Sequence, residues 1–115
     1  MTITVTLDTA GNVQLDPLEE IKKRNGKTKH SVNWKRGKKQ DFVFVGVNIE
    51  APEGVFGTPE IKDKTITVTD HIRKGSATVD YPYRVHVRTP DGRVHSSGGE
   101  GPELEGGRGV IRNQP

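Results

Sequence analysis

Residues 77–89 read ATVDYPYRVHVRT and form the longest run of alternating polar and apolar side chains in the chain. Side chains point alternately to the two faces of a strand, so this run predicts a long strand with one face on a hydrophobic core. The apolar face would carry Val79, Tyr81, Tyr83, Val85 and Val87. Pro82 lacks the N–H that a ladder needs, which predicts either a bulge at Pro82 or a place at the edge of a sheet.

The residues after this strand predict a hairpin. Thr89-Pro90-Asp91-Gly92 is a turn sequence, and residues 93–95 would form the return strand. A loop of two residues would place Val87 opposite Val94 and His86 opposite His95. We favour this register because it keeps the two valines together on one face.

Shorter alternating runs predict the other strands. Ile3, Val5 and Leu7 alternate with threonines at the start of the chain, and Val32 shares a strand face with Trp34, which we expect to fill the core. Residues 42–49 are apolar on both faces, which predicts a central strand covered on both sides. The remaining strands are expected at residues 13–15, 65–69 and 110–113.

A helix-start signal interrupts the strands at Asp16. Asp is a favoured N-cap residue, Pro17 suits the first helical position, and the carboxylate of Glu19 can reach back to the cap. Asn25 and Gly26 would end the element. We therefore expect a short helix or a single turn over residues 17–24.

The sum is an all-β sandwich of about seven or eight strands with at most one short helix. A chain of 115 residues is long enough for one compact domain, and we assign residues 1–115 to it. Residues 96–109 are rich in glycine and show no apolar periodicity, which predicts a flexible connector before the final strand at residues 110–113.

The charges of the chain are unevenly distributed. Nine of the 18 Lys and Arg residues lie between Lys22 and Lys39, where there is no Asp or Glu, and with a net charge of +3 the rest of the chain sums to −6. Such a segment favours an anionic partner. The predicted basic patch consists of Lys22, Lys23, Arg24, Lys27, Lys29, Lys35, Arg36, Lys38, Lys39, Arg84, Arg88 and Arg93.

Composition excludes several classes of site. The chain has no cysteine, so it forms no disulfide, no thiolate metal site and no blue-copper centre. His86 and His95 would meet across the hairpin, but no third ligand is placed beside them, and we expect no metal and no cofactor. The first residues, MTITVTLDT, are typical of a strand and not of a signal peptide, and no apolar run is long enough to span a membrane. These features predict a cytoplasmic protein without a membrane partner.

Several landmarks in order resemble one family. They are Asp41-Phe-Val-Phe-Val-Gly46, Gly57-Thr-Pro-Glu-Ile61, Thr65-Ile-Thr-Val-Thr-Asp70, Tyr81-Pro-Tyr-Arg-Val85 and Val110-Ile-Arg-Asn-Gln-Pro115. Together they are similar to the small bacterial DP-EP family. This resemblance implies an immunoglobulin-like or cupredoxin-like β-sandwich that cleaves itself at an Asp-Pro bond just before the final strand. At the corresponding place this chain has Arg108-Gly109.

Self-cleavage requires a carboxyl group that attacks the bond or activates water. Asp70, at the end of a predicted strand, and Asp80, among tyrosines, are the candidate catalytic residues, with Glu60 as a further carboxylate. The Asp-Pro pair at residues 16–17 is explained by helix capping.

The pattern favours a non-enzymatic module that binds a ligand or associates with itself as a homo-oligomer. In that hypothesis the basic segment of one copy meets Glu100, Glu103 and Glu105 of another. Two alternatives come from other classes. One is an aspartic-type endopeptidase that processes itself through Asp70 or Asp80, and the other is a domain that binds nucleic acid or another polyanion through residues 22–39.

Overall fold

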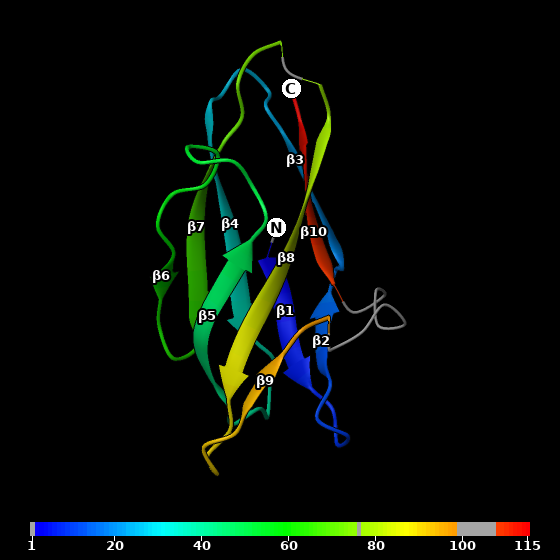
Figure 1. Cartoon of the computed structure of the whole chain (residues 1–115), viewed down its shortest axis with the longest axis vertical. Helices are drawn as coiled ribbons and strands as arrows, with labels where there is room; N and C mark the ends of the chain where they lie inside the picture. Colours follow the sequence, from blue (N-terminus) through cyan, green and yellow to red (C-terminus); the bar gives the residue numbers. More distant parts are fainter. Residues whose placement is uncertain (1, 76, 99–107) are drawn as a thin grey trace.

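The computed structural model describes residues 2–75, 77–98 and 108–115, which fold into two β-sheets packed face to face (Figure 1). The first sheet has the order β2-β1-β4-β7-β6, and the second has the order β3-β10-β8-β5, with β9 also paired to β8. The described residues contain ten strands and no helix, which confirms the all-β prediction. Their bounds are β1 Thr2–Leu7, β2 Val13–Asp16, β3 Glu19–Lys23, β4 Lys29–Arg36, β5 Val43–Ile49, β6 Glu60–Ile61, β7 Thr65–His71, β8 Val79–Arg88, β9 Val94–Ser96 and β10 Gly109–Gln114.

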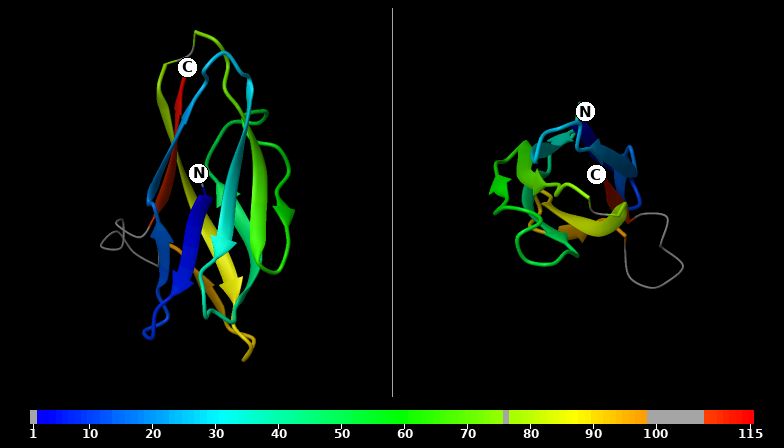
Figure 2. Two further views of the ribbon diagram at one scale, coloured as in Figure 1. Left: turned by 180° about the vertical axis from the view of Figure 1, so that it is seen from behind. Right: turned by 90° about the horizontal axis from the view of Figure 1, so that it is seen from above.

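The core lies between the sheets and consists of the inward-facing residues of their strands. Seen from above, the two sheets curve around this common interior (Figure 2). Trp34 is fully buried, as predicted, and its ring meets that of Tyr83 edge-to-face at 5.2 Å between centroids. Ile3 of β1 and Ile111 of β10 belong to the same core cluster. The core therefore joins strands from both ends of the chain.

The predicted helix over residues 17–24 is wrong, because this segment contains the strand β3. Asp16-Pro17 marks the passage from β2 in the first sheet to β3 in the second. β3 pairs in parallel with β10, so that Glu19 lies opposite Val110 and Lys23 opposite Gln114. The capping pattern expresses only a local preference for a helix. The ladder with β10 instead provides hydrogen-bond partners for the backbone groups of β3, from residues that lie almost a whole chain away in sequence. Pairing with the last strand overrides the helix signal.

β5 is an edge strand and not the central strand that its two apolar faces predicted. The register with β8 shifts between Phe44 and Gly46, which is a bulge at Val45. Phe44 before the bulge faces the core, and after it Val47 and Ile49 pack against the same core. A bulge inserts one extra residue and so reverses the alternation. The run is apolar because the bulge changes which residues face the core: Phe44 does so before it, and Val47 and Ile49 do so after it. Only one face of β5 is buried.

β8 lies between β10 and β5, so Pro82 is in a central strand that is regular at this position. The carbonyl of Pro82 accepts a hydrogen bond from the N–H of Glu50, just beyond the end of β5. In a strand, the nitrogen and the carbonyl of one residue point to the same side. The nitrogen of Pro82 therefore points toward Glu50, beyond the end of β5, where no strand residue needs its hydrogen bond. Pro82 thus breaks no bond of the ladder, and the predicted bulge or edge position is wrong.

The β8–β9 hairpin has a loop of three residues, 90–92, and not two. Val87 pairs with His95 and Arg88 with Val94, while the Thr89 N–H donates to the Arg93 carbonyl. Gly92 has φ +87°, the left-handed conformation that closes a three-residue loop. The predicted pairing of His86 with His95 is therefore wrong by one residue, and Val94 is 59% exposed.

β9 and β10 pair with β8 along successive parts of its length. β9 lies beside residues 86–88, and β10 lies beside residues 79–83. The final strand is present as predicted, and the described part of the chain leaves β9 at Gly98 and resumes at Arg108 beside it. Most of the predicted connector at 96–109 lies outside the described residues.

Candidate functional site

Asp70 is a fully buried acid near the end of β7. Ile66, Val68 and Asp70 share the inward face of this strand, so the alternation that buries the two apolar residues also buries the carboxyl group. Asn113 of β10 reaches it from the other sheet and donates a hydrogen bond from Nδ2 to Asp70 Oδ1 at 2.7 Å. Burial raises the pKa of Asp70, although Asn113, His30, Lys22 and His71 act against it.

Glu20 and Lys22 lie on the inward face of β3 and belong to the same region. The Glu20 side chain is 3% exposed and that of Lys22 is 13% exposed, and Lys22 Nζ lies 3.4 Å from Glu20 Oε1. Lys22 is the register partner of Asn113 on the neighbouring parallel strand. Two acids, a lysine and an amide thus converge between the sheets, and we call Glu20, Lys22, Asp70 and Asn113 the buried polar cluster.

Three oxygen atoms of this cluster have no hydrogen-bond partner among the described residues. They are Glu20 Oε2, Asp70 Oδ2 and Asn113 Oδ1. An unpaired buried polar atom costs free energy, so native proteins keep few of them. Three of the seven unpartnered buried side-chain atoms among the described residues therefore lie in this one cluster.

His30, on β4, lies next to the buried polar cluster. It is the register partner of Asp70, and its Nε2 donates to the carbonyls of Arg24 at 3.1 Å and Lys27 at 2.9 Å. These bonds fix the turn between β3 and β4. His30 therefore links the buried polar cluster to the surface loop above it.

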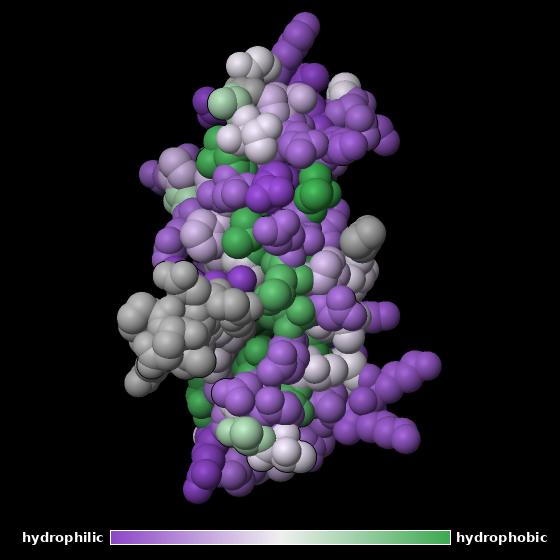
Figure 3. All heavy atoms as spheres, turned by 90° about the vertical axis from the view of Figure 1, so that its right-hand side faces the viewer, coloured by the Kyte–Doolittle hydropathy of each residue, from purple (hydrophilic) through white to green (hydrophobic). Residues whose placement is uncertain are grey.

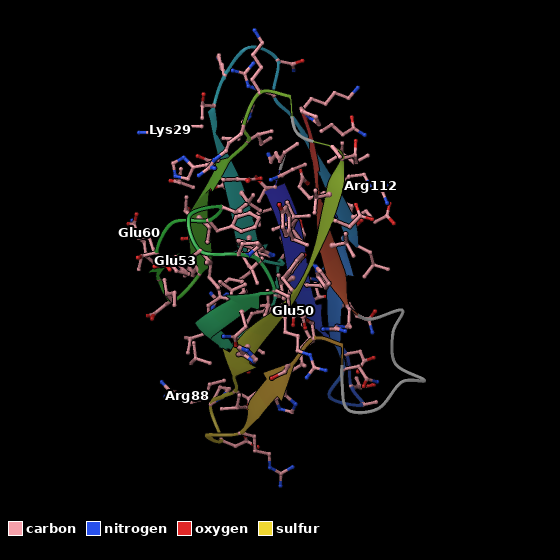
Figure 4. All side chains as sticks on the ribbon, turned by 45° about the horizontal axis from the view of Figure 1, so that its top comes forward. Lys29, Glu50, Glu53, Glu60, Arg88 and Arg112 are labelled. Carbon is pink, nitrogen blue, oxygen red and sulfur yellow. The ribbon has the colours of Figure 1, made fainter. Side chains whose placement is uncertain are left out.

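Asp80 lies on the outer face of β8 and does not meet Asp70. It accepts hydrogen bonds from Arg112 Nε at 2.7 Å and Nη2 at 3.1 Å. The Arg112 side chain, which stands on the outer face of β10 in Figure 4, lowers the pKa of Asp80. Glu60, the further candidate carboxylate, is exposed on β6 with Lys62 at 3.3 Å. The predicted acids thus occupy separate environments.

The Arg108-Gly109 bond contacts none of these acids directly. Arg108 pairs with Glu50 at 2.6 Å, and Gly109 packs so closely on Tyr83 that a Cβ at this position would overlap the ring. Asp70 contacts Asn113 instead, four residues beyond Gly109. Self-processing at this bond stays a prediction.

The predicted basic patch is divided between the two ends of the sandwich. Lys29 at the start of β4 and Arg88 at the end of β8 lie at opposite ends of the molecule in Figure 4. Lys35, Arg36, Lys38, Lys39, Arg88 and Arg93 belong to the end that also carries the β8–β9 hairpin. Arg84 lies between the ends, near Gly98.

The other end gathers cations from two connections, which we call the cationic tip. The β3–β4 and β7–β8 connections are joined by the hydrogen bond from the Ile72 N–H to the Thr28 carbonyl. Neither connection contains Asp or Glu. The tip consists of Lys23, Arg24, Lys27, Lys29, Arg73 and Lys74, of which all but the half-buried Arg24 are exposed. Lys22, Lys23, Lys27 and His30 also line an open depression there.

The two hairpin histidines have different partners. His86 contacts Ser96 Oγ and Asn48 Oδ1, each at 2.6 Å, while His95 Nδ1 lies 3.2 Å from the Gly11 carbonyl. Burial lowers the pKa of His86, and Arg84 adds to the effect. Within residues 2–75, 77–98 and 108–115, no three side chains of the metal-ligating types converge. No helix among these residues is long and apolar enough to cross a membrane.

Glu20 and Asn113 are members of the cluster that sequence reasoning missed, and Lys22 was assigned only to the surface patch. The helix hypothesis concealed Glu20 and Lys22, because in a strand their spacing of two residues places both on one face. Asn113 follows Ile111 at the same spacing and so shares its inward face. The spacing of two residues along β3 and β10 was the sequence signal that could have placed these polar side chains on the inward face.

Comparison with known proteins identifies no relative: no family model matches the chain, and no curated protein matches it. The similarity to the DP-EP family stays a prediction from sequence landmarks.

Proposed function

We propose that this protein is a non-enzymatic β-sandwich module that binds an acidic partner through the cationic tip, and that the partner is the acidic segment of a second copy. The observation that carries this proposal is the gathering of six cations at one end of the molecule. Four lie in two connections that contain no carboxylate, and two lie at the strand ends beside them. A surface of one sign attracts a partner of opposite sign and repels an identical surface.

The chain itself supplies a complementary segment. Residues 99–107 contain Glu100, Glu103 and Glu105 and no Lys or Arg. The described residues that flank this segment, Gly98 and Arg108, lie beside β8, whereas the tip lies beyond the far end of β10. A contact between the tip of one copy and this segment of another joins two different surfaces. It is therefore head-to-tail and can grow beyond a dimer.

The edge of the second sheet offers apolar surface for the same contact. Leu18, just before β3, and Ile21, within β3, are 41% and 47% exposed, and Ile21 also lines the depression at the tip. Figure 3 shows apolar side chains between hydrophilic ones on the face that carries β3 and β10. An edge strand with unpaired backbone groups is a common place for another chain to add.

Nucleic acid is the alternative partner, and the surface favours it less. None of the six aromatic side chains is exposed. Trp34, Phe42, Phe44 and Tyr83 are buried, and the half-buried Phe56 and Tyr81 pack edge-to-face on each other, so none offers an open stacking platform for bases. Binding would then rest on phosphate contacts alone, and its affinity would fall steeply with salt.

The test is the native mass of the full chain at low and high salt. We expect oligomers at low salt that dissociate as salt rises, because screening weakens contacts between exposed charges. Lys27→Gln, Lys29→Gln and Lys74→Gln together should abolish association, as should Glu100→Gln, Glu103→Gln and Glu105→Gln together. The matched control, Lys35→Gln, Lys38→Gln and Lys39→Gln at the opposite end, removes the same charge and should associate normally.

A monomer under all conditions, or oligomers that the tip substitutions leave intact, would contradict the proposal. A monomer that binds double-stranded DNA with a steep salt dependence, and loses this binding in the tip variant, would support the nucleic-acid alternative instead.

A further inference from the structure

The buried polar cluster holds the reactants for a covalent bond between two strands. Lys22 carries a primary amine and Asn113 a carboxamide, and the two residues are register partners on neighbouring parallel strands. Such strands lie about 4.8 Å apart, and a lysine side chain is long enough to reach the side chain opposite it. We infer that Lys22 Nζ and Asn113 Cγ join in an intramolecular isopeptide bond with release of ammonia.

Glu20 is placed to free the amine for attack. Only an uncharged amine is a nucleophile, and Lys22 must therefore lose a proton first. Glu20 Oε1 lies 3.4 Å from Lys22 Nζ, and both side chains are largely shielded from water. Glu20 is therefore the carboxylate that stands within reach of Nζ to accept this proton.

Asp70 is placed to activate the amide. Its Oδ1 accepts the hydrogen bond from Asn113 Nδ2, while its Oδ2 and Asn113 Oδ1 have no partner among the described residues. A proton on Asp70 Oδ2 would supply a hydrogen bond to Asn113 Oδ1, so that both unpaired atoms are satisfied together. Burial of Asp70 favours this protonated form. The carboxylic acid would then stabilise the negative charge that develops on Oδ1.

The atoms balance without any further reactant. Nζ attacks Cγ, and the tetrahedral intermediate takes a proton on Oδ1 from Asp70. A second Nζ proton passes through Asp70 to Nδ2. As the Cγ–Nδ2 bond breaks, the carbonyl re-forms and the proton on Oδ1 returns to Asp70. The products are the amide between residues 22 and 113, free ammonia and protonated Glu20, whose proton ammonia then accepts. Asn113 also borders a hollow of about 260 Å³ lined by His71, Ile72 and Tyr81, which offers ammonia a way out.

The test is the intact mass of the full chain under denaturing conditions. The wild type should weigh less than its sequence by one ammonia. Trypsin should yield residues 113–115 joined to residues 1–23, because cleavage follows Arg112 but is blocked at the acylated Lys22. Lys22→Arg and Asn113→Ala should each keep the full mass, and Lys23→Arg, which alters the exposed neighbour, should lose ammonia like the wild type.

One further variant and a check for a competing reaction keep the test decisive. Asp70→Asn should keep the full mass if it folds, and a joined peptide in that variant would exclude the acid role of Asp70. Succinimide formation at Asn25-Gly26 also releases ammonia, but it would persist in Lys22→Arg and would give no joined peptide. A folded wild type that keeps its full mass after prolonged incubation would overturn the inference. This outcome is independent of the partner of the cationic tip.

Discussion

Asp70 and Asp80 show how position on a strand decides the chemistry of one residue type. Asp70 faces inward, where loss of hydration raises its pKa, while Asp80 faces outward, where the Arg112 hydrogen bonds lower its pKa. Sequence reasoning selected both as candidate catalytic acids because it could not place them in different environments. Their opposite shifts lead to separate predictions.

Arg112→Gln should raise the pKa of Asp80 toward its ordinary value of 3.8, because it removes the charged donor of two hydrogen bonds. Carboxyl chemical shifts followed by NMR during a pH titration would measure this. The ion pair contributes stability above pH 3.8, and that contribution is lost as pH falls through the lowered pKa. Asp8 is a matched control, because its pKa is lowered chiefly by the backbone N–H of Asn12 and should not change. An unchanged Asp80 titration would exclude Arg112 as the cause.

Asp70 should act on stability in the opposite direction. A raised folded-state pKa means that the folded chain holds the proton more tightly, so stability falls as pH rises from 3.8 through that pKa. In the Lys22→Arg background, where no bond to Asn113 can form, a further Asp70→Asn should remove this decline. Urea unfolding at pH values between the ordinary pKa values of Asp and His would compare the two chains. Parallel pH profiles would contradict the assignment.

At the scale of the element, β3 and β10 depend on each other. The strand β3 forms where the local pattern favours a helix, because β10 provides a parallel partner for all five of its residues. β10 in turn requires Gly109, since its backbone lies against the ring of Tyr83. The last strand and an early one are therefore formed together.

Gly109→Ala should destabilise the protein by about 1–3 kcal/mol, the usual cost of adding a methyl group to a close-packed site. The added Cβ would overlap the Tyr83 ring and displace β10 from β8. Gly46→Ala is the control, because its Cβ would lie 3.7 Å from His86 Cδ2, an ordinary contact, and should change the free energy of unfolding little. Chemical denaturation of both variants measures the difference, and equal effects would show that the Tyr83 contact is not tight.

At the scale of the whole molecule, the proposed bond would close most of the chain into one loop. Of the strands, only β1, β2, the first three residues of β3 and the last residue of β10 would lie outside the loop from Lys22 to Asn113. Parallel pairing of β3 and β10 brings together residues that are far apart in sequence, which makes the closure large.

The linked wild type should therefore be more stable than Lys22→Arg by up to about 4–5 kcal/mol, the loop-closure value for roughly 100 residues. Lys23→Arg, which leaves the reacting groups in place, should match the wild type. Thermal unfolding with intact mass measured on the same samples would relate stability to the bond. A linked protein that unfolds like Lys22→Arg would show that loop closure is offset by strain in the folded state.

The amino-acid sequence by itself determined the all-β class, the core residues Trp34, Tyr83 and Val85, and the final strand, because a period of two needs only near neighbours to be recognised. Tertiary structure alone decided that residues 19–23 form a strand, that β5 lies at an edge, and that the basic segment is divided between two ends. These features depend on which strands pair, and pairing is settled by contacts across the chain. The same reason explains the buried polar cluster: Glu20, Lys22, Asp70 and Asn113 lie on three strands, and only the packed sheets bring them together.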